Sequence, residues 1–293
     1  SLHNAGFGGA YYYISDGLSK EDYDELHRIP IERGLPLSLG EPEVPWAVQL
    51  YPGVYESCPI TASYDYYEKF APGDPAQYIS AGAGSDEWAK TVCDPFSLVT
   101  EVPYFMSAKI GDETPIERTR RDVVLEGIDR GRRIFELLAS DLTATEGLIT
   151  QAEGKLLRNA VATFVKSGLK SIPSQKRWAQ EAPGMDQPAT VAQEADSLYV
   201  GVFYKMIIAS MLARAIGGEL EAEDQAECCD GGCGCGCAPK RQILQPILSD
   251  LNSHIDRWAS DIEENLSYEV VPIKNLIEVQ YGALLVVLKA KGF

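Results

Sequence analysis

The chain has little positive charge for its length. Its 293 residues include 26 Lys and Arg residues against 43 Asp and Glu residues, which gives a formal net charge of −17. Binding to nucleic acid or to anionic lipid needs a basic face that neutralises phosphate groups. We therefore expect neither nucleic acid nor a membrane surface among the partners. The length allows one large domain or two smaller ones, each with a buried core.

Long apolar runs are also missing. A membrane-spanning helix needs about 20 successive residues that are predominantly apolar. The best candidate, LYVGVFYKMIIASMLARAI, is interrupted by Lys205 and Arg214. This stretch is therefore predicted to form a buried helix rather than a membrane span.

Cysteine is scarce outside one short stretch. Five of the seven cysteines crowd into CCDGGCGCGC, at residues 228–237. A secreted disulfide framework spreads its cysteines through the fold, so this distribution favours a reducing, cytoplasmic location. The spacing is too tight for a zinc ribbon, whose cysteines come in two separated pairs. We expect a flexible Cys/Gly-rich loop at residues 226–238, with binding of a soft metal such as Cu(I) or zinc as the alternative.

Residues 1–112 have the composition of an α/β domain. Apolar runs in AYYYI and FSLVTEV predict buried strands, and the turn-rich segments GEPEVPW and APGDP separate the elements. The segment SKEDYDELHRI begins with Ser19 as an N-cap and places Tyr23, Leu26 and Ile29 on one face of a helix. We expect a mixed sheet flanked by helices.

Residues 113–293 change to a helical period. The segments RRDVVLEGIDRGRRIFELL and KLLRNAVATFVKSGL place apolar residues at helical intervals, and the pattern continues over residues 192–217, 241–266 and 273–290. The segment at residues 171–190, which contains three prolines, is expected to be a linker between helices. The chain is thus predicted to divide near residue 112 into an α/β part and an all-helical part.

Two polar residues stand beside the predicted strands. His3, in SLHNAGFGG, precedes a glycine-rich bend, and Glu101, in FSLVTEVPYF, precedes Pro103, which is expected to end its strand. Functional groups of α/β proteins gather at the carboxyl ends of strands. We therefore expect both side chains at the same edge of one sheet. From spacing alone, the alternative is a capping or solvent-exposed His3 and a surface Glu101.

Several segments resemble a known family. SLHNAGFGGAYYYI resembles the part of the zinc metallocarboxypeptidases (carboxypeptidase A-like peptidases) in which Ser-x-His supplies the third zinc ligand. LVTEVPYF resembles the later strand whose Glu is the general base, and GLPLSLGEPEVPWA and SYDYYEKFAPGDPAQYI resemble a bacterial branch of that family. The resemblance covers about residues 1–112 and implies a carboxypeptidase fold that is incomplete at its N-terminus.

The resemblance also implies a chemistry. His3 would be a ligand of Zn²⁺, and Glu101 would take a proton from the metal-activated water and deliver it to the leaving amine. The substrate would be a peptide cleaved at its C-terminal bond, or an N-acyl amino acid if the same scaffold serves a deacylase or amidase. Tyr78 stands near the place of the family's substrate-binding tyrosine, but its surroundings match poorly and we expect it to pack in the fold.

One departure from the family pattern is clear. The family takes its first two zinc ligands from a His-x-x-Glu motif, which this sequence lacks; its other histidines, His27 and His254, stand in ELHRIP and NSHIDRW. We therefore expect a chain that begins just before the third zinc ligand and shows no zinc-dependent turnover by itself. A non-catalytic binding module is the alternative.

Overall fold

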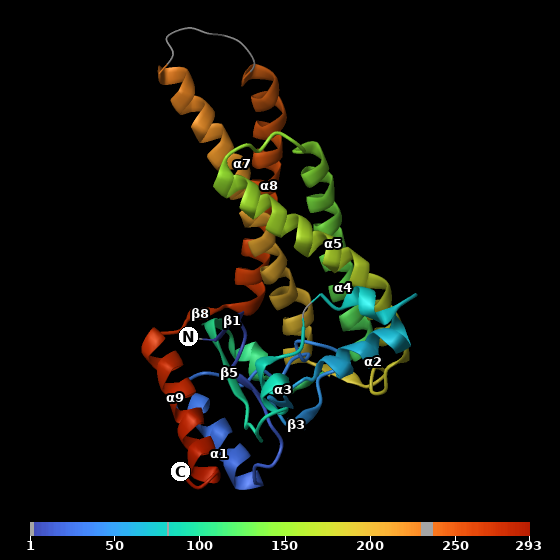
Figure 1. Cartoon of the computed structure of the whole chain (residues 1–293), viewed down its shortest axis with the longest axis vertical. Helices are drawn as coiled ribbons and strands as arrows, with labels where there is room; N and C mark the ends of the chain where they lie inside the picture. The colour runs from blue at the N-terminus through green and yellow to red at the C-terminus, as the bar shows by residue number, and fades with distance from the viewer. Residues whose placement is uncertain (1–2, 81, 230–236) are drawn as a thin grey trace. The chain divides into compact units, whose positions relative to one another are not determined.

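The computed structural model describes residues 3–80, 82–229 and 237–293 (Figure 1). Contacts divide the chain into two compact units. The first contains Ser1–Glu126, Pro173–Val200 and Asn265–Phe293, and the second contains Gly127–Ile172 and Gly201–Glu264. The sequence predicts a single boundary near residue 112, from a change in composition. Each of the two units instead combines separate stretches of the chain.

The first unit is built on a mixed sheet, as predicted. The strands in the order β1-β5-β2-β4-β3 are β1 (Asn4–Phe7), β5 (Leu98–Met106), β2 (Tyr11–Ile14), β4 (Val54–Glu56) and β3 (Gln49–Tyr51), and β8 (Glu269–Val270) also pairs with β5. The pairs β1–β5 and β2–β4 are parallel, and the other pairs are antiparallel. The alternation of buried and half-buried residues in YYYI is the pattern of a strand with two different faces.

Strand β5 joins the two halves of this sheet. Its first residues pair with β2, with Tyr11 opposite Glu101, and its later residues pair with β1, with Asn4 opposite Val102. The expected end of this strand at Pro103 is wrong, because β5 continues to Met106. Proline removes only one backbone donor, and here it stands opposite Gly6 where the register of β1 shifts, so the ladder tolerates it.

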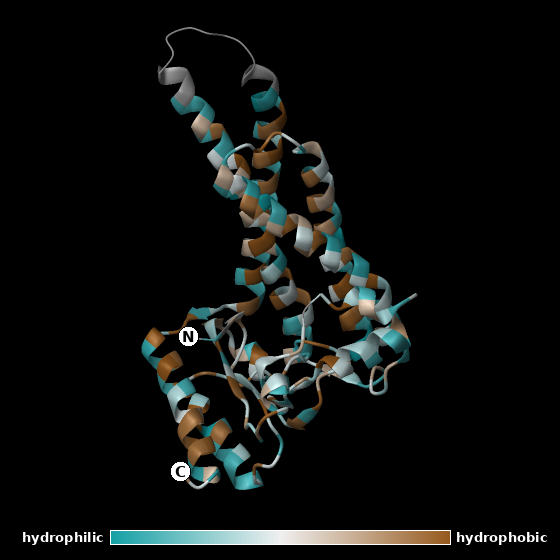
Figure 2. Cartoon of the chain, viewed as in Figure 1, coloured by the Kyte–Doolittle hydropathy of each residue, from teal (hydrophilic) through white to brown (hydrophobic). Residues whose placement is uncertain are grey.

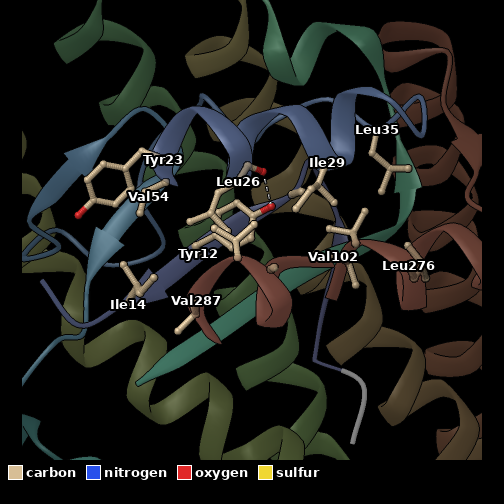
Figure 3. Packing of buried hydrophobic residues seen from close by; sticks show 14 of the residues in the cluster. Tyr12, Ile14, Tyr23, Leu26, Ile29, Leu35, Val54, Val102, Leu276 and Val287 are labelled. Atoms are coloured by element: carbon tan, nitrogen blue, oxygen red, sulfur yellow. Dashed lines mark hydrogen bonds between the residues drawn. The ribbon is translucent and has the colours of Figure 1, made fainter. Parts of the chain in front are cut away.

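Helices α1 (Lys20–Ile31) and α9 (Ile273–Ala290) contribute to the core that covers one face of the sheet (Figure 3). Ser19 caps α1 in a capping box with Asp22, which confirms the predicted start of this helix. Tyr12 is fully buried, and its hydroxyl donates a hydrogen bond to the Leu26 carbonyl at 2.8 Å. Helix α9 is apolar along much of its length (Figure 2).

Shorter elements complete the first unit. They are α2 (Ile60–Phe70), η1 (Pro75–Tyr78), α3 (Ser85–Ala89), η2 (Ala108–Gly111), the strand pair β6 (Pro115–Thr119) and β7 (Pro188–Thr190), α6 (Val191–Ala195) and the π-helical turn η3 (Asp196–Val200). Because β6, β7 and β8 fall within residues 113–293, the described part of the region predicted to be all-helical is mainly helical but also contains three short strands.

The described residues of the second unit form parts of four long helices: α4 (Arg120–Ala144), α5 (Ala152–Glu181), α7 (Gly201–Cys229) and α8 (Cys237–Leu266). The linker predicted at residues 171–190 is wrong for its first half, because α5 continues through Pro173 to Glu181. Ser174 and Ala179 are fully buried on this helix, and burial outweighs the loss of one backbone hydrogen bond at proline.

Two predictions concern helix α7 and its end. By length and composition, Val191–Gln225 is apolar enough to cross a membrane; 39% of its most apolar window is buried in the molecule, and the core helix of a soluble protein meets the same criterion.

The predicted Cys/Gly-rich loop at residues 226–238 has its centre, residues 230–236, outside the described residues.

Candidate functional site

The structure brings His3 and Glu101 into contact. The Nδ1 atom of His3 lies 2.9 Å from Oε1 of Glu101, although 98 residues separate them. The contact follows from the parallel register of β1 and β5: Asn4 stands beside Val102, so the residues that precede them are also neighbours. The predicted juxtaposition on one sheet is therefore present in the fold.

The positions of the two residues within their strands differ from the prediction. His3 directly precedes β1 instead of ending a strand, and Glu101 is an internal residue of β5. Their side chains differ in exposure: 58% of the His3 side chain and 14% of the Glu101 side chain are accessible to solvent. The imidazole thus faces water, while the carboxylate is mostly covered.

Helix α9 holds the backbone of both strands at this point. The Nε2 atom of Gln280 donates hydrogen bonds to the carbonyl oxygens of His3 and Thr100, at 2.8 Å and 2.9 Å. One side-chain amide thereby connects the residue before β1 to the residue before Glu101. Sequence reasoning missed Gln280, because an isolated glutamine in a helical pattern gives no sign of a partner 277 residues away.

A second carboxylate, Glu43, lies near Glu101. The hydroxyl of Tyr11 donates a hydrogen bond to Oε2 of Glu43 at 3.3 Å, and Tyr11 stands directly opposite Glu101 in the β2–β5 ladder. Burial, and then the negative charge of Glu101, raise the pKa of Glu43. Glu43 comes from the turn-rich segment GEPEVPW, in which an acidic residue carries no sequence signal of a site.

The other histidines and Tyr78 have contacts of their own. His27 donates from Nε2 to the Pro52 carbonyl at 2.6 Å, and burial lowers the pKa of its imidazole. His254 lies 3.7 Å from Asp250 on α8. Tyr78 stacks on Tyr67 with 4.9 Å between the ring centroids, which agrees with its expected packing role.

The donor atoms at this site are too few for a catalytic zinc ion. A catalytic zinc takes three protein ligands and keeps one position for water. Within residues 3–80, 82–229 and 237–293, no group of three or more His, Cys, Asp or Glu side chains is placed to hold a metal. The pair of His3 and Glu101 supplies one imidazole and one carboxylate, which is fewer than a catalytic zinc needs.

Comparison with known proteins gave no match among family models, curated proteins or solved structures. No relative therefore assigns a role to His3 or Glu101. An imidazole and a carboxylate in contact can exchange protons or bind a cation, and both kinds of chemistry occur at hydrolytic sites.

Proposed function

We propose that this protein is a zinc-dependent hydrolase of the metallocarboxypeptidase type. It would cleave the C-terminal bond of a peptide or, as a deacylase or amidase, the amide bond of an N-acyl amino acid. The supporting observation is the 2.9 Å contact between His3 and Glu101. The family resemblance assigns metal binding to one of these residues and proton transfer to the other, and the fold places both at one point.

Each residue has a distinct part in this proposal. Glu101 is the general base, because a carboxylate beside an imidazole can take a proton from water and return it to a leaving amine. His3 presents its imidazole toward solvent, where Nδ1 contacts Glu101 and the other ring nitrogen, Nε2, would be the ligand of a metal. Gln280 holds the backbone on which both depend.

The described part of the chain does not fit a complete zinc site, since with Glu101 as the base it offers one ligand here, His3, where three are needed. The remaining ligands would have to come from other residues. A bound zinc would supply an activated water near pH 7 and polarise the scissile carbonyl.

Zinc binding to the metal-stripped chain tests the proposal directly. We expect weak zinc binding in equilibrium dialysis. In His3→Ala the zinc affinity should fall by about tenfold or more, because removal of a ligand lowers affinity. Glu101→Gln is expected to bind zinc as the wild type does, and His254→Ala serves as a control for an imidazole elsewhere. Binding that survives in His3→Ala but falls in His254→Ala would contradict the assignment of the metal ligand.

Hydrolysis of a blocked dipeptide in the presence of zinc tests the role of Glu101. Any turnover that a chelator abolishes is expected to fall by about 10²- to 10⁴-fold in Glu101→Gln, the usual contribution of a general base. The matched variant Glu68→Gln changes an exposed carboxylate on α2 and is expected to keep the wild-type rate. Chelator-sensitive turnover that is undiminished in Glu101→Gln would refute the proposed function.

A further inference from the structure

A cavity of about 480 Å³ opens on the face of the sheet that carries Glu101. Tyr13 of β2 and Val99 of β5 line it, and these two residues stand opposite each other in the ladder. Tyr11 and Glu101 form the next pair on the same face, because residues two apart in a strand point the same way. The cavity is therefore directly beside the candidate site.

The walls of this cavity combine aromatic rings with negative charge. Tyr13 and Trp46 supply the rings, and Glu43 and Asp86 supply the carboxylates. Of the described residues that line it, none is Lys, Arg or His. A cavity with this lining repels anions and favours a cation that carries an apolar stem.

Glu43 is the carboxylate between the cavity and Glu101. It lines the cavity and accepts a hydrogen bond from Tyr11, the residue opposite Glu101. No cationic partner of Glu43 occurs in the described part of the chain. The charge of Glu101 raises the pKa of Glu43, after burial, and a bound cation would reverse that effect.

We propose that this cavity binds a cationic substrate side chain, an ammonium or guanidinium group on an aliphatic stem, and that Glu43 selects it. The inference rests on the proposed function, because it places this side chain beside the bond that Glu101 would help to cleave. The stem packs against Tyr13 and Trp46, and the cation forms a charge-assisted hydrogen bond with Glu43. Glu43 is thus a specificity-determining residue.

Calorimetric titration of the full chain with Nα-acetyl-arginine and with Nα-acetyl-citrulline tests this selection. Citrulline has nearly the shape of arginine but no charge. We expect the wild type to bind the arginine derivative at least about tenfold more tightly, as a single charge-assisted contact provides. In Glu43→Gln the ratio of the arginine affinity to the citrulline affinity should fall close to one, and in Glu43→Asp it should lie between this value and that of the wild type. Glu68→Gln, which changes an exposed carboxylate, should leave the ratio unchanged.

Equal binding of the two compounds by the wild type, or a preference that persists in Glu43→Gln, would overturn the inference. If Glu43→Gln fails to fold by circular dichroism, Glu43→Asp decides: its preference for the arginine derivative should fall below that of the wild type, and a preference equal to the wild type would overturn the inference. The titration needs neither zinc nor turnover. A chain that prefers the arginine derivative but whose zinc binding is the same in His3→Ala would refute the proposed hydrolase alone.

Discussion

Replacement of Glu219 by glutamine is expected to destabilise the second unit strongly. Only 2% of this residue is exposed, and its carboxylate accepts hydrogen bonds from the backbone N–H groups of Thr150 and Gln151 at 2.7 Å and 2.9 Å. The Thr150 hydroxyl and the Lys240 ammonium both donate to Oε1 at 2.5 Å. Glu219 thereby satisfies backbone donors just before α5, where a helix start leaves them unpaired.

The size of the effect follows from the pKa of Glu219. Burial alone would raise this pKa, but the hydrogen bonds from Gln151, Lys240 and Thr150 lower it from 4.5 to about 2. At 1.36 kcal/mol per pKa unit, the ionised carboxylate contributes about 3 kcal/mol to the free energy of unfolding. Because the folded pKa is depressed, this contribution is present above about pH 4.5 and is lost as the pH falls toward about 2.

Urea denaturation followed by circular dichroism at pH 3 to 7 measures this contribution. Glu219→Gln should lose about 3 kcal/mol at pH 7 and progressively less at lower pH, because protonation of the wild-type carboxylate removes the same interactions. Glu153→Gln is the control, since its ion pair with Arg214 is exposed on both sides and should change stability by less than about 1 kcal/mol. A loss in Glu219→Gln that is under about 0.5 kcal/mol, or that does not vary with pH, would refute the reasoning.

Three further substitutions have expected outcomes. Gln280→Ala removes two hydrogen bonds and should lower stability by about 1–3 kcal/mol in thermal denaturation while broadening the His3 signals in NMR spectra; sharp, unshifted His3 signals would argue against its positioning role. Ser19→Ala removes the α1 cap and should cost about 1 kcal/mol by the same method, with exposed Lys20→Ala as the neutral comparison. Asp141→Asn should stabilise the chain at pH 7 but not at pH 4. Burial, and then the charge of Asp250, raise the pKa of Asp141 from 3.8 to about 6, so ionisation of Asp141 destabilises the folded chain as the pH rises from about 4 to 6. Equal urea midpoints of the variant and the wild type at pH 7 would refute this prediction.

Local patterns predict much of the first unit. Ser19 and the acidic first turn predict the start of α1, and the apolar runs predict β2 and β5, because caps and periodicity depend on near neighbours. The contact between His3 and Glu101 is accessible to the same reasoning, since two residues beside adjacent strands are brought together by any pairing of those strands.

The features that sequence reasoning missed depend on distant parts of the chain. Pro103 and Pro173 break local rules, yet strand pairing and burial keep β5 and α5 continuous through them. Gln280 contacts the site through hydrogen bonds to the backbone, and Glu43 lines the cavity beside it. Neither residue lies in a local pattern that distinguishes it from other polar residues. Long-range placement, rather than residue type, gives them their importance.

The dependence of His3 on Gln280 also sets the order in which the site can assemble during synthesis. These residues are 277 positions apart, and β5 pairs with β8 at residue Val270, so segments made late in this stretch complete the sheet that much earlier segments form. Contacts of such high sequence separation slow folding. Until α9 is made, the apolar face of the sheet that it covers remains exposed, and exposed apolar surface promotes aggregation. Co-translational chaperones that shield an exposed apolar face should therefore raise the soluble yield of this protein more than additional time for refolding does.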